Sequence, residues 1–404
     1  MMNKEEKQTA PPESSVRGSN QSGLRAHNER LVLTLIRQNG PLAKADIARR
    51  TGLSAQTVSV IMRALEADGL LEKRDPVRGK VGQPSVPMGL APKGAFFLGL
   101  KVGRRSLDLI LIDFVGTIVG RQHHTHRHPS PDEVVDFANR AIAELLEKLS
   151  PAEQLRVAGL GVAIPFNLWD WATILDVQAK EMASWRDHDI AAEIGANWQF
   201  PVYLQNDATS ACGAELVFGS AERPSDFLHF FIGFFIGGGV VLNHNVYTGH
   251  SGNAGALGSS PILTESGETT QLIDIASLAA LEKAVVAEGG NPRMIWESPS
   301  EWTVPEQVLE SWINRAAGGI AQVIWSSCSV IDFSVVVIDG WLPDPVRRDL
   351  VARVRQILAG LPLAGINAPE VEEGTIGSDA RSLGAASLPL SERFLLDSHS
   401  FMKS

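Results

Sequence analysis

Apolar positions in the first quarter of the chain recur at helical spacing in three short segments, at 28–38, 44–50 and 55–68. Ser54 is a favourable N-cap for the third helix, and a glycine-containing turn precedes it. After the third helix comes a loop rich in Gly, Arg and Lys around 78–83, which is typical of a β-wing. Three helices followed by a wing predict a winged helix-turn-helix.

A linker rich in proline and glycine, residues 79–94, separates this region from an alternation of strands and helices. The pattern runs through a first series and then restarts near residue 227, which predicts two similar α/β halves with a ligand-sized cleft between them. The expected strands are 96–100, 107–113, 117–121, 157–164, 202–204, 227–232, 239–242, 245–247 and 333–338. The expected helices are 131–149, 207–218, 273–288, 304–329, 345–359 and 379–388.

Charge is distributed unevenly along the chain. The 404 residues carry a net charge of −10, which alone argues against a nucleic-acid partner. Residues 1–95, however, hold 15 Lys and Arg against 9 Asp and Glu, a net charge of +6, whereas the remainder carries −16. A basic first quarter on an acidic body indicates a nucleic-acid module joined to a second function.

Composition bears on the compartment. Apolar residues make up 44% of the chain, enough for a sizeable core. Only Cys212 and Cys328 are present, too few for a disulfide framework, which indicates a reducing compartment. Residues 1–23 are polar, lack the apolar core of a signal peptide and are expected to form a disordered arm. We therefore expect a cytoplasmic protein without a membrane partner.

The outer face of the third helix carries candidate DNA-reading side chains. Gln, Ser and Thr can hydrogen-bond to base edges, whereas Lys and Arg suit phosphates. The alternative is a trihelical protein-interaction domain with a polar surface, but the basic charge and the glycine-rich wing favour DNA. The predicted DNA contacts are Lys44, Arg49, Ser54, Gln56, Thr57, Ser59, Arg63 and Gln83.

Six short motifs then occur in a fixed order: LIDFVG at 111–116, GVAIP at 161–165, VYLQND at 202–207, GGGVVLN at 237–243, GHSGNAG at 249–255 and LGAA at 383–386. With these motifs the chain resembles the ROK family of repressors, open reading frames and sugar kinases, from about Leu24 to Leu390. The N-terminal part is similar to the winged helix of family regulators such as the xylose and N-acetylglucosamine repressors. The resemblance implies an α/β fold in which this winged helix precedes a two-lobed actin-like, hexokinase-like (ribonuclease H-like) ROK domain.

The chain departs from the pattern of the family's kinases at several positions. Lys101 stands where the phosphate loop has Asp, and Arg104 stands where it has a second glycine. Ala256 and Ser259 replace the Glu that binds sugar and the His that binds zinc, and the zinc loop has become the cysteine-free segment 265–270. The resemblance with these departures implies no phosphoryl transfer, no cofactor and no metal of the family's kind.

Other family positions are retained. Asn206 and Asp207 match the pair whose Asp is the kinase general base, so Asp207 is expected to bind sugar as a vestigial catalytic group. The resemblance implies that the ligand also contacts Trp185, Asn253 and Gly255, although Trp185 could equally be part of the core. Two interpretations stay open for Trp169 and Trp171, which are suited to sugar stacking or to core packing. For Lys101, Arg104 and Arg105 the open alternatives are binding of a phosphate-bearing ligand and a solvated basic turn.

The domain layout expected is an arm at 1–23, the winged helix at 24–88 and a ROK domain at 95–404, with lobes at 95–205 and 226–390. We hypothesise a transcriptional regulator of carbohydrate-metabolism genes, expected to be a repressor. It would bind a near-palindromic double-stranded operator as a homodimer or homotetramer and would sense a sugar or a derivative as effector. The alternatives are an ATP-dependent sugar kinase with an attached DNA-binding domain, and a ROK region that only dimerises.

Overall fold

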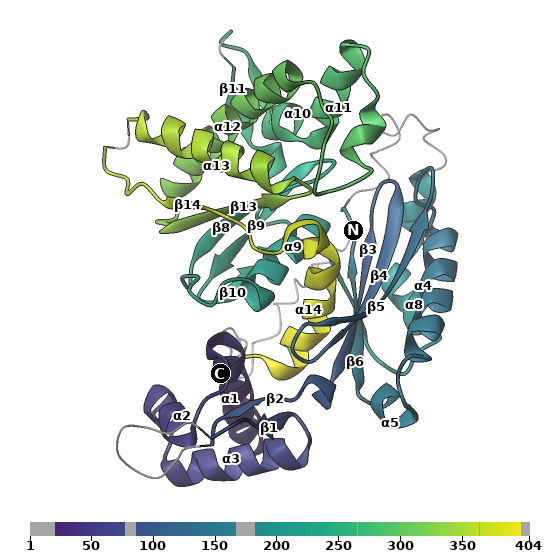
Figure 1. Cartoon of the computed structure of the whole chain (residues 1–404), viewed down its shortest axis with the longest axis vertical. Coiled ribbons are helices and arrows are strands. Elements are labelled where there is room, and N and C mark those ends of the chain that lie inside the picture. Colours follow the sequence, from purple (N-terminus) through teal and green to yellow (C-terminus); the bar gives the residue numbers. More distant parts are fainter. Residues whose placement is uncertain (1–20, 77–85, 167–181, 265, 363, 397–404) are drawn as a thin grey trace, which may run out of the picture.

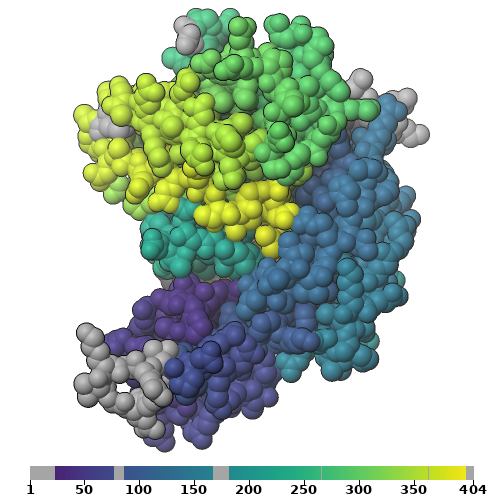
Figure 2. Space-filling view, in the orientation of Figure 1, coloured from purple at the N-terminus to yellow at the C-terminus, as the bar shows by residue number. Residues whose placement is uncertain are grey.

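The computed structural model describes residues 21–76, 86–166, 182–264, 266–362 and 364–396. The expected arm up to residue 20, the wing residue Gln83 and the pair Trp169 and Trp171 lie outside these ranges. Within them, a small N-terminal domain lies below two larger lobes (Figure 1). The space-filling view shows this domain, in purple, against the blue first lobe and far from the green helices of the second lobe (Figure 2).

The N-terminal domain is a winged helix-turn-helix, as the periodicity predicts. Gly52, with φ of +70°, ends the second helix in the left-handed conformation that favours glycine. The Ser54 hydroxyl then accepts from the backbone N–H of Thr57 at 3.1 Å and caps the third helix. The first helix begins seven residues before its expected start at residue 28, so residues 21–23 of the expected arm are helical, and the wing strands extend to Leu90. The elements are α1 (Gln21–Asn39), α2 (Lys44–Thr51), α3 (Ala55–Ala67) and the antiparallel pair β1 (Leu71–Lys73) and β2 (Met88–Leu90).

The first lobe is built on a five-stranded sheet in the order β5-β4-β3-β6-β7. Its first three strands form an antiparallel meander, and the last two run parallel to β3. The strands are β3 (Phe96–Val102), β4 (Ser106–Asp113), β5 (Ile118–Thr125), β6 (Val157–Ala163) and β7 (Val202–Gln205). The outer face is covered by α4 (Pro131–Leu146) and α8 (Ile190–Gly195), and the short α5 (Pro151–Gln154) precedes β6.

The second lobe repeats this topology, with the strand order β10-β9-β8-β13-β14. The repeat predicted from the restarting pattern is therefore confirmed. The edge strand β14 was missed because its acidic residues surround the single buried Val371, which leaves no apolar pattern. The strands are β8 (Phe227–Ile232), β9 (Ile236–Leu242), β10 (Asn245–Tyr247), β13 (Val335–Gly340) and β14 (Glu370–Glu373).

Helices and a small hairpin cover the outer face of the second sheet. The largest hydrophobic cluster of the molecule lies there, with Trp312 fully buried at its centre. The helices are α10 (Leu272–Ala276), α11 (Leu278–Ala287), α12 (Glu306–Cys328) and α13 (Asp344–Ala359), and the hairpin, also missed in the sequence, is β11 (Pro261–Leu263) with β12 (Thr269–Gln271). Among the described residues, none of the helices combines the length and apolar character that a bilayer span requires.

Two helices lie between the sheets and join the lobes (Figure 1). The helix α9 (Asp207–Phe218) packs on β8 and β9, and α14 (Ala380–Phe394) packs on α9 and on β3 and β6. The expected second lobe, 226–390, is wrong in this respect, because α14 lies against the sheet of the first lobe. The pattern of α14 is amphipathic in itself, and nothing local to the sequence indicates which sheet receives it.

Glycines set the distance between α14 and its neighbours. A Cβ atom added to Gly161 of β6 would lie 1.8 Å from the Ala385 carbonyl oxygen, and one added to Gly99 of β3 would lie 2.2 Å from that of Ser382. A Cβ on Gly384 itself would lie 1.7 Å from the Ser210 carbonyl oxygen of α9. The backbones approach so closely that only hydrogen fits at these positions.

The N-terminal domain is docked on the first lobe through both side chains and backbone. Arg37 of α1 donates to the Phe114 carbonyl and lies near the rings of Phe114 and Phe218. Burial lowers the pKa of Arg37 to about 10, which still leaves it charged. At the end of α14, Phe394 packs on Phe114 with ring centroids 5.0 Å apart. The winged helix and the end of α14 therefore share one hydrophobic core.

The glycine contacts give a stability prediction. Replacing Gly161→Ala forces a methyl group into a backbone carbonyl, so we expect the free energy of unfolding to fall by more than about 3 kcal/mol. Gly318→Ala in α12 is the matched control, because a Cβ there meets nothing within 4 Å. The control should leave stability unchanged or raise it by about 0.5–1 kcal/mol. Urea denaturation of both variants checks this, and equal midpoints would contradict the close packing.

Candidate functional site

A cleft opens between the two lobes at the start of α9. Its walls come from the β3–β4 turn, the start of β9, the loop at 253–259 and the first turn of α14. Four of the five residues predicted to bind ligand line it: Asn206, Asp207, Asn253 and Gly255. The structure thus brings together positions up to 49 residues apart in the chain, and their role in binding stays a prediction.

Asn206 and Asp207 are placed by the beginning of α9. The Asn206 side-chain oxygen accepts from the backbone N–H groups of Ala208 at 3.0 Å and Thr209 at 3.2 Å, so Asn206 is the N-cap. The Asp207 carboxylate accepts from the Arg381 guanidinium at 3.3 Å. Arg381, in the first turn of α14, was missed in the sequence, because 174 residues separate the partners and no motif links them.

Trp185 lies beside the cleft rather than in it. Only 6% of the residue is exposed, and its indole N–H donates to the Pro129 carbonyl at 3.0 Å. It lines a second hollow that shares Asn253 and Phe166 with the cleft. The structure therefore supports the role of Trp185 in the core rather than in ligand binding, because the side chain is buried and its indole N–H already has an acceptor.

The β3–β4 hairpin, where the resemblance places the phosphate loop of the kinases, contains an internal ion pair. Lys101 of β3 donates to Asp108 of β4 at 2.6 Å, and both side chains are buried. Burial lowers the pKa of Lys101, and the Arg381 charge lowers it further. Burial raises the pKa of Asp108, but Lys101 and His123 outweigh this effect and hold it at about 2. The Lys101 ammonium is therefore neutralised by Asp108 within the hairpin.

The neighbouring arginines reach across to the second lobe. The Arg104 guanidinium stacks on the Phe234 ring with its central carbon 3.9 Å from the ring centroid. Arg105 donates to Glu282 of α11 at 2.8 Å. The interpretation of this segment as a solvated turn is wrong, because Lys101 is buried and both arginines contact the opposite lobe.

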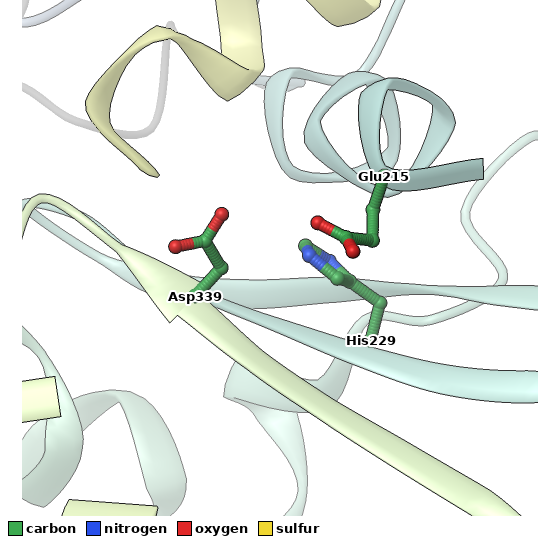
Figure 3. Close-up of side chains that lie close together, drawn as sticks. All are labelled: Glu215, His229 and Asp339. Atoms are coloured by element: carbon green, nitrogen blue, oxygen red, sulfur yellow. The ribbon is translucent and has the colours of Figure 1, made fainter. Parts of the chain in front are cut away.

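A buried polar cluster lies in the second lobe, behind the cleft. Glu215 of α9, His229 of β8 and Asp339 of β13 converge there, with potential ligand atoms within 4.8 Å of one another (Figure 3). Burial lowers the pKa of His229 to about 4 and raises the pKa of Asp339. Neither ring nitrogen of His229 has a hydrogen-bond partner.

The donor set of this cluster does not fit a metal ion. The Glu215 carboxylate already accepts from Arg223 at 2.8 Å and from the Thr375 backbone N–H at 3.0 Å, so a guanidinium occupies the cation position. The segment that resembles the family's zinc motif, Ala256–Ser259, offers neither thiolate nor imidazole. Within the described ranges, the Glu215 cluster is the one group with metal-like spacing.

The polar face of the winged helix is exposed, but several of its side chains already form hydrogen bonds within the domain. Lys44, Arg49, Gln56 and Arg63 are exposed on α2 and α3. The Ser54 and Thr57 hydroxyls lie 2.8 Å apart and form part of the helix cap. These two side chains are therefore used locally. The exposed cations also have partners: Arg49 pairs with Asp46 at 2.5 Å, and Lys44 and Arg63 each donate to Ser59, so a role of these residues in DNA binding stays a prediction. Val60, half exposed on the same helix, adds an apolar contact surface.

Comparisons with known proteins match both parts of the chain. Residues 97–392 match the ROK family, and residues 25–72 match a winged helix-turn-helix DNA-binding family. A relative named xylose repressor, from Bacillus spizizenii, is 27% identical over 248 residues, which cover 60% of this chain and 62% of that protein.

Solved structures share the fold. A structure described as a ROK family transcriptional regulator, a homologue of the Escherichia coli MLC protein, aligns with a TM-score of 0.66. The two are 21% identical, and the alignment covers 94% of this chain and 98% of that one. A ROK hexokinase from Thermus thermophilus aligns with a TM-score of 0.52 and 23% identity, covering 72% and 97%.

These matches extend over both domains, and the ROK match alone spans well over half of the sequence. The hexokinase aligns with less of the chain than the regulator does. The same two-lobed architecture therefore occurs both in a regulator and in a kinase. The chain belongs to the ROK family, with a winged helix-turn-helix domain at its N-terminus.

Proposed function

We propose that this protein is a DNA-binding transcriptional repressor of carbohydrate-metabolism genes, controlled by a sugar-derived ligand in the cleft. The observation that carries the proposal is the joining of a winged helix, with an exposed recognition face, to a ROK cleft. The relative named xylose repressor supports the same assignment. A DNA-reading domain packed on a ligand-sized cleft is the arrangement that an effector-controlled regulator needs.

The ROK domain is proposed to be non-catalytic. Phosphoryl transfer needs a metal-bound nucleotide, and the loop that would approach the phosphates holds the Lys101–Asp108 pair instead. The sugar-binding Glu and the zinc-binding His of the family are Ala256 and Ser259 here. The retained Asp207 is hydrogen-bonded to Arg381, and it can accept from a ligand hydroxyl without removing its proton.

The effector signal has a direct route to the winged helix along α14. At its beginning, Arg381 contacts Asp207 in the cleft. At its end, Phe394 packs on the docking core, and the following Leu396 N–H donates to the Thr34 hydroxyl of α1 at 3.0 Å. A helix of 15 residues covers about 22 Å. A ligand that displaces Arg381 would therefore bias the position of the DNA-binding domain.

We further propose that the protein acts as a homodimer or homotetramer. A winged helix reads a short half-site, and two copies related by symmetry read a near-palindrome. A change in the placement of α1 relative to the first lobe would then change the spacing between the two recognition helices. This links ligand binding to loss of the operator without unfolding either domain.

Selection of bound duplexes from a random pool tests DNA recognition. The wild type should enrich one near-palindromic sequence. Gln56→Ala should lower affinity for it by about 1–3 kcal/mol and relax the preference at one base position of each half-site. Arg63→Ala should weaken binding to all sequences alike and reduce the slope of log K against log salt by about 1.

Arg315→Ala is the control for these variants, because Arg315 is exposed on α12 in the second lobe, away from the winged helix. It removes one positive charge without touching the recognition face. Selection without any enriched sequence, or an equal loss of affinity in Arg315→Ala and Arg63→Ala, would contradict the assignment of α3 as the recognition helix.

A sugar kinase is the second candidate, because Asp207 is retained. Thermal unfolding with panels of sugars, each with and without MgATP, separates the two functions. A ligand at 100 times its Kd should add about 2.7 kcal/mol of stability, a shift of a few degrees, and MgATP should add nothing. The same ligand should release the selected operator. Steady ATP turnover that Asp207→Asn abolishes would overturn the regulator and establish the kinase.

A further inference from the structure

The charge of the cleft differs from that of a neutral-sugar site. Its described lining residues include two cations, Arg104 and Arg381, and one acid, Asp207. The remaining polar lining is uncharged, with Asn206, Asn253 and Ser259 among it. A neutral sugar needs acceptors and donors in balance, whereas this cleft has a surplus of guanidinium donors.

Arg104 has a charge without a full set of partners. The acid nearest to it, Glu282, already accepts from Arg105 at 2.8 Å and from the Trp296 indole N–H at 3.0 Å. Arg104 lies 3.7 Å from Glu282, beyond hydrogen-bond distance, and its Nη1 is buried without a hydrogen-bond partner. The Phe234 ring holds the guanidinium plane in place. Arg104 is thus oriented and available for a further acceptor.

Arg381, in the first turn of α14, also lines the cleft and also has an unpaired guanidinium nitrogen. Its Nη1 contacts Asp207 at 3.3 Å, a long bond for a charged pair, and its Nε is buried without a partner. The guanidinium lies over the Phe231 ring at 5.2 Å. The Arg381 charge lowers the pKa of the nearby Lys101, and the Asp108 carboxylate balances the positive charge of Lys101. Asp207 is therefore the acid that balances Arg381, and Arg104 remains in excess.

We infer that the effector is an anionic sugar derivative, with a carboxylate or phosphate group held by Arg104 and Arg381. Both groups present the planar or tetrahedral oxygen edges that a guanidinium binds with two hydrogen bonds. Asn253 and the side-chain NH2 of Asn206, whose oxygen caps α9, remain for ring hydroxyls. The inference rests on the proposed function and names the chemical class of its ligand. An anion bound by Arg381 competes with Asp207, and this competition releases the first turn of α14.

Titration of the full chain with matched ligand sets tests this inference. Each set contains a neutral monosaccharide, its uronic or aldonic acid and its phosphate ester, and inorganic phosphate alone serves as the fourth arm. The acid or the ester should raise the melting temperature and release the selected operator, whereas the neutral sugar should do neither. The arm that responds distinguishes a carboxylate from a phosphate ester.

Single variants locate the anion. Arg104→Gln and Arg381→Gln should each weaken the anionic ligand about 10- to 100-fold, because each removes a charge-assisted pair. Arg381→Lys should recover part of the affinity, since lysine restores the positive charge but cannot form the bidentate hydrogen bonds of a guanidinium. Arg315→Gln, on the outer helix α12, should bind like the wild type. Arg104→Gln should still bind the operator when no ligand is present, which shows that the variant is folded.

The outcomes separate this inference from the proposed function. A neutral sugar that releases the operator, with an affinity unchanged in Arg104→Gln and Arg381→Gln, would keep the regulator and overturn the anionic ligand. An anionic ligand that binds equally well to all variants would also overturn it. Operator binding that no member of any set alters would contradict both sensing and the inference.

Discussion

The close approach of α14 to its neighbours is the constraint on which the remaining architecture depends. Gly99 and Gly161 let its backbone touch the first sheet, and Gly384 lets it touch α9. Because α9 in turn packs on the second sheet, the two lobes are joined through a pair of helices made largely of small residues. Any larger side chain in this layer would separate the lobes and widen the cleft between them.

The sequence predicted those features that depend on local periodicity and missed those that depend on tertiary contacts. The helices of the winged domain and both strand meanders follow from their apolar spacing and caps, so each of them was found. Their limits were less accurate: α1 begins seven residues before its predicted start, and β5 ends four residues after its predicted end. The edge strand β14 was missed because only Val371 is buried in it. The Arg381–Asp207 contact was missed for a different reason: Arg381 is an ordinary arginine in an amphipathic helix, and only the fold brings it to the cleft.

The Lys101–Asp108 pair gives the β3–β4 hairpin an internal electrostatic constraint. In the buried β3–β4 hairpin each charge is tolerable because the other is 2.6 Å away. Replacing Lys101 with an acid would place two carboxylates side by side and leave Asp108 with His123 as its remaining partner, a loss of several kcal/mol in a buried site. An acid at position 101 therefore requires a coupled change at Asp108.

The same logic of paired charges explains how a small ligand can move a large domain. Asp207 and Arg381 form an ion pair in the cleft at 3.3 Å, which constrains the first turn of α14. A ligand shifts the equilibrium between two arrangements of α14 only as far as it binds them with different free energies. A ligand that bonds only to groups with fixed positions would bind tightly and change little. A ligand that takes the guanidinium from Asp207 acts on a contact of the first turn of α14, and the other end of that helix lies in the core of the winged domain.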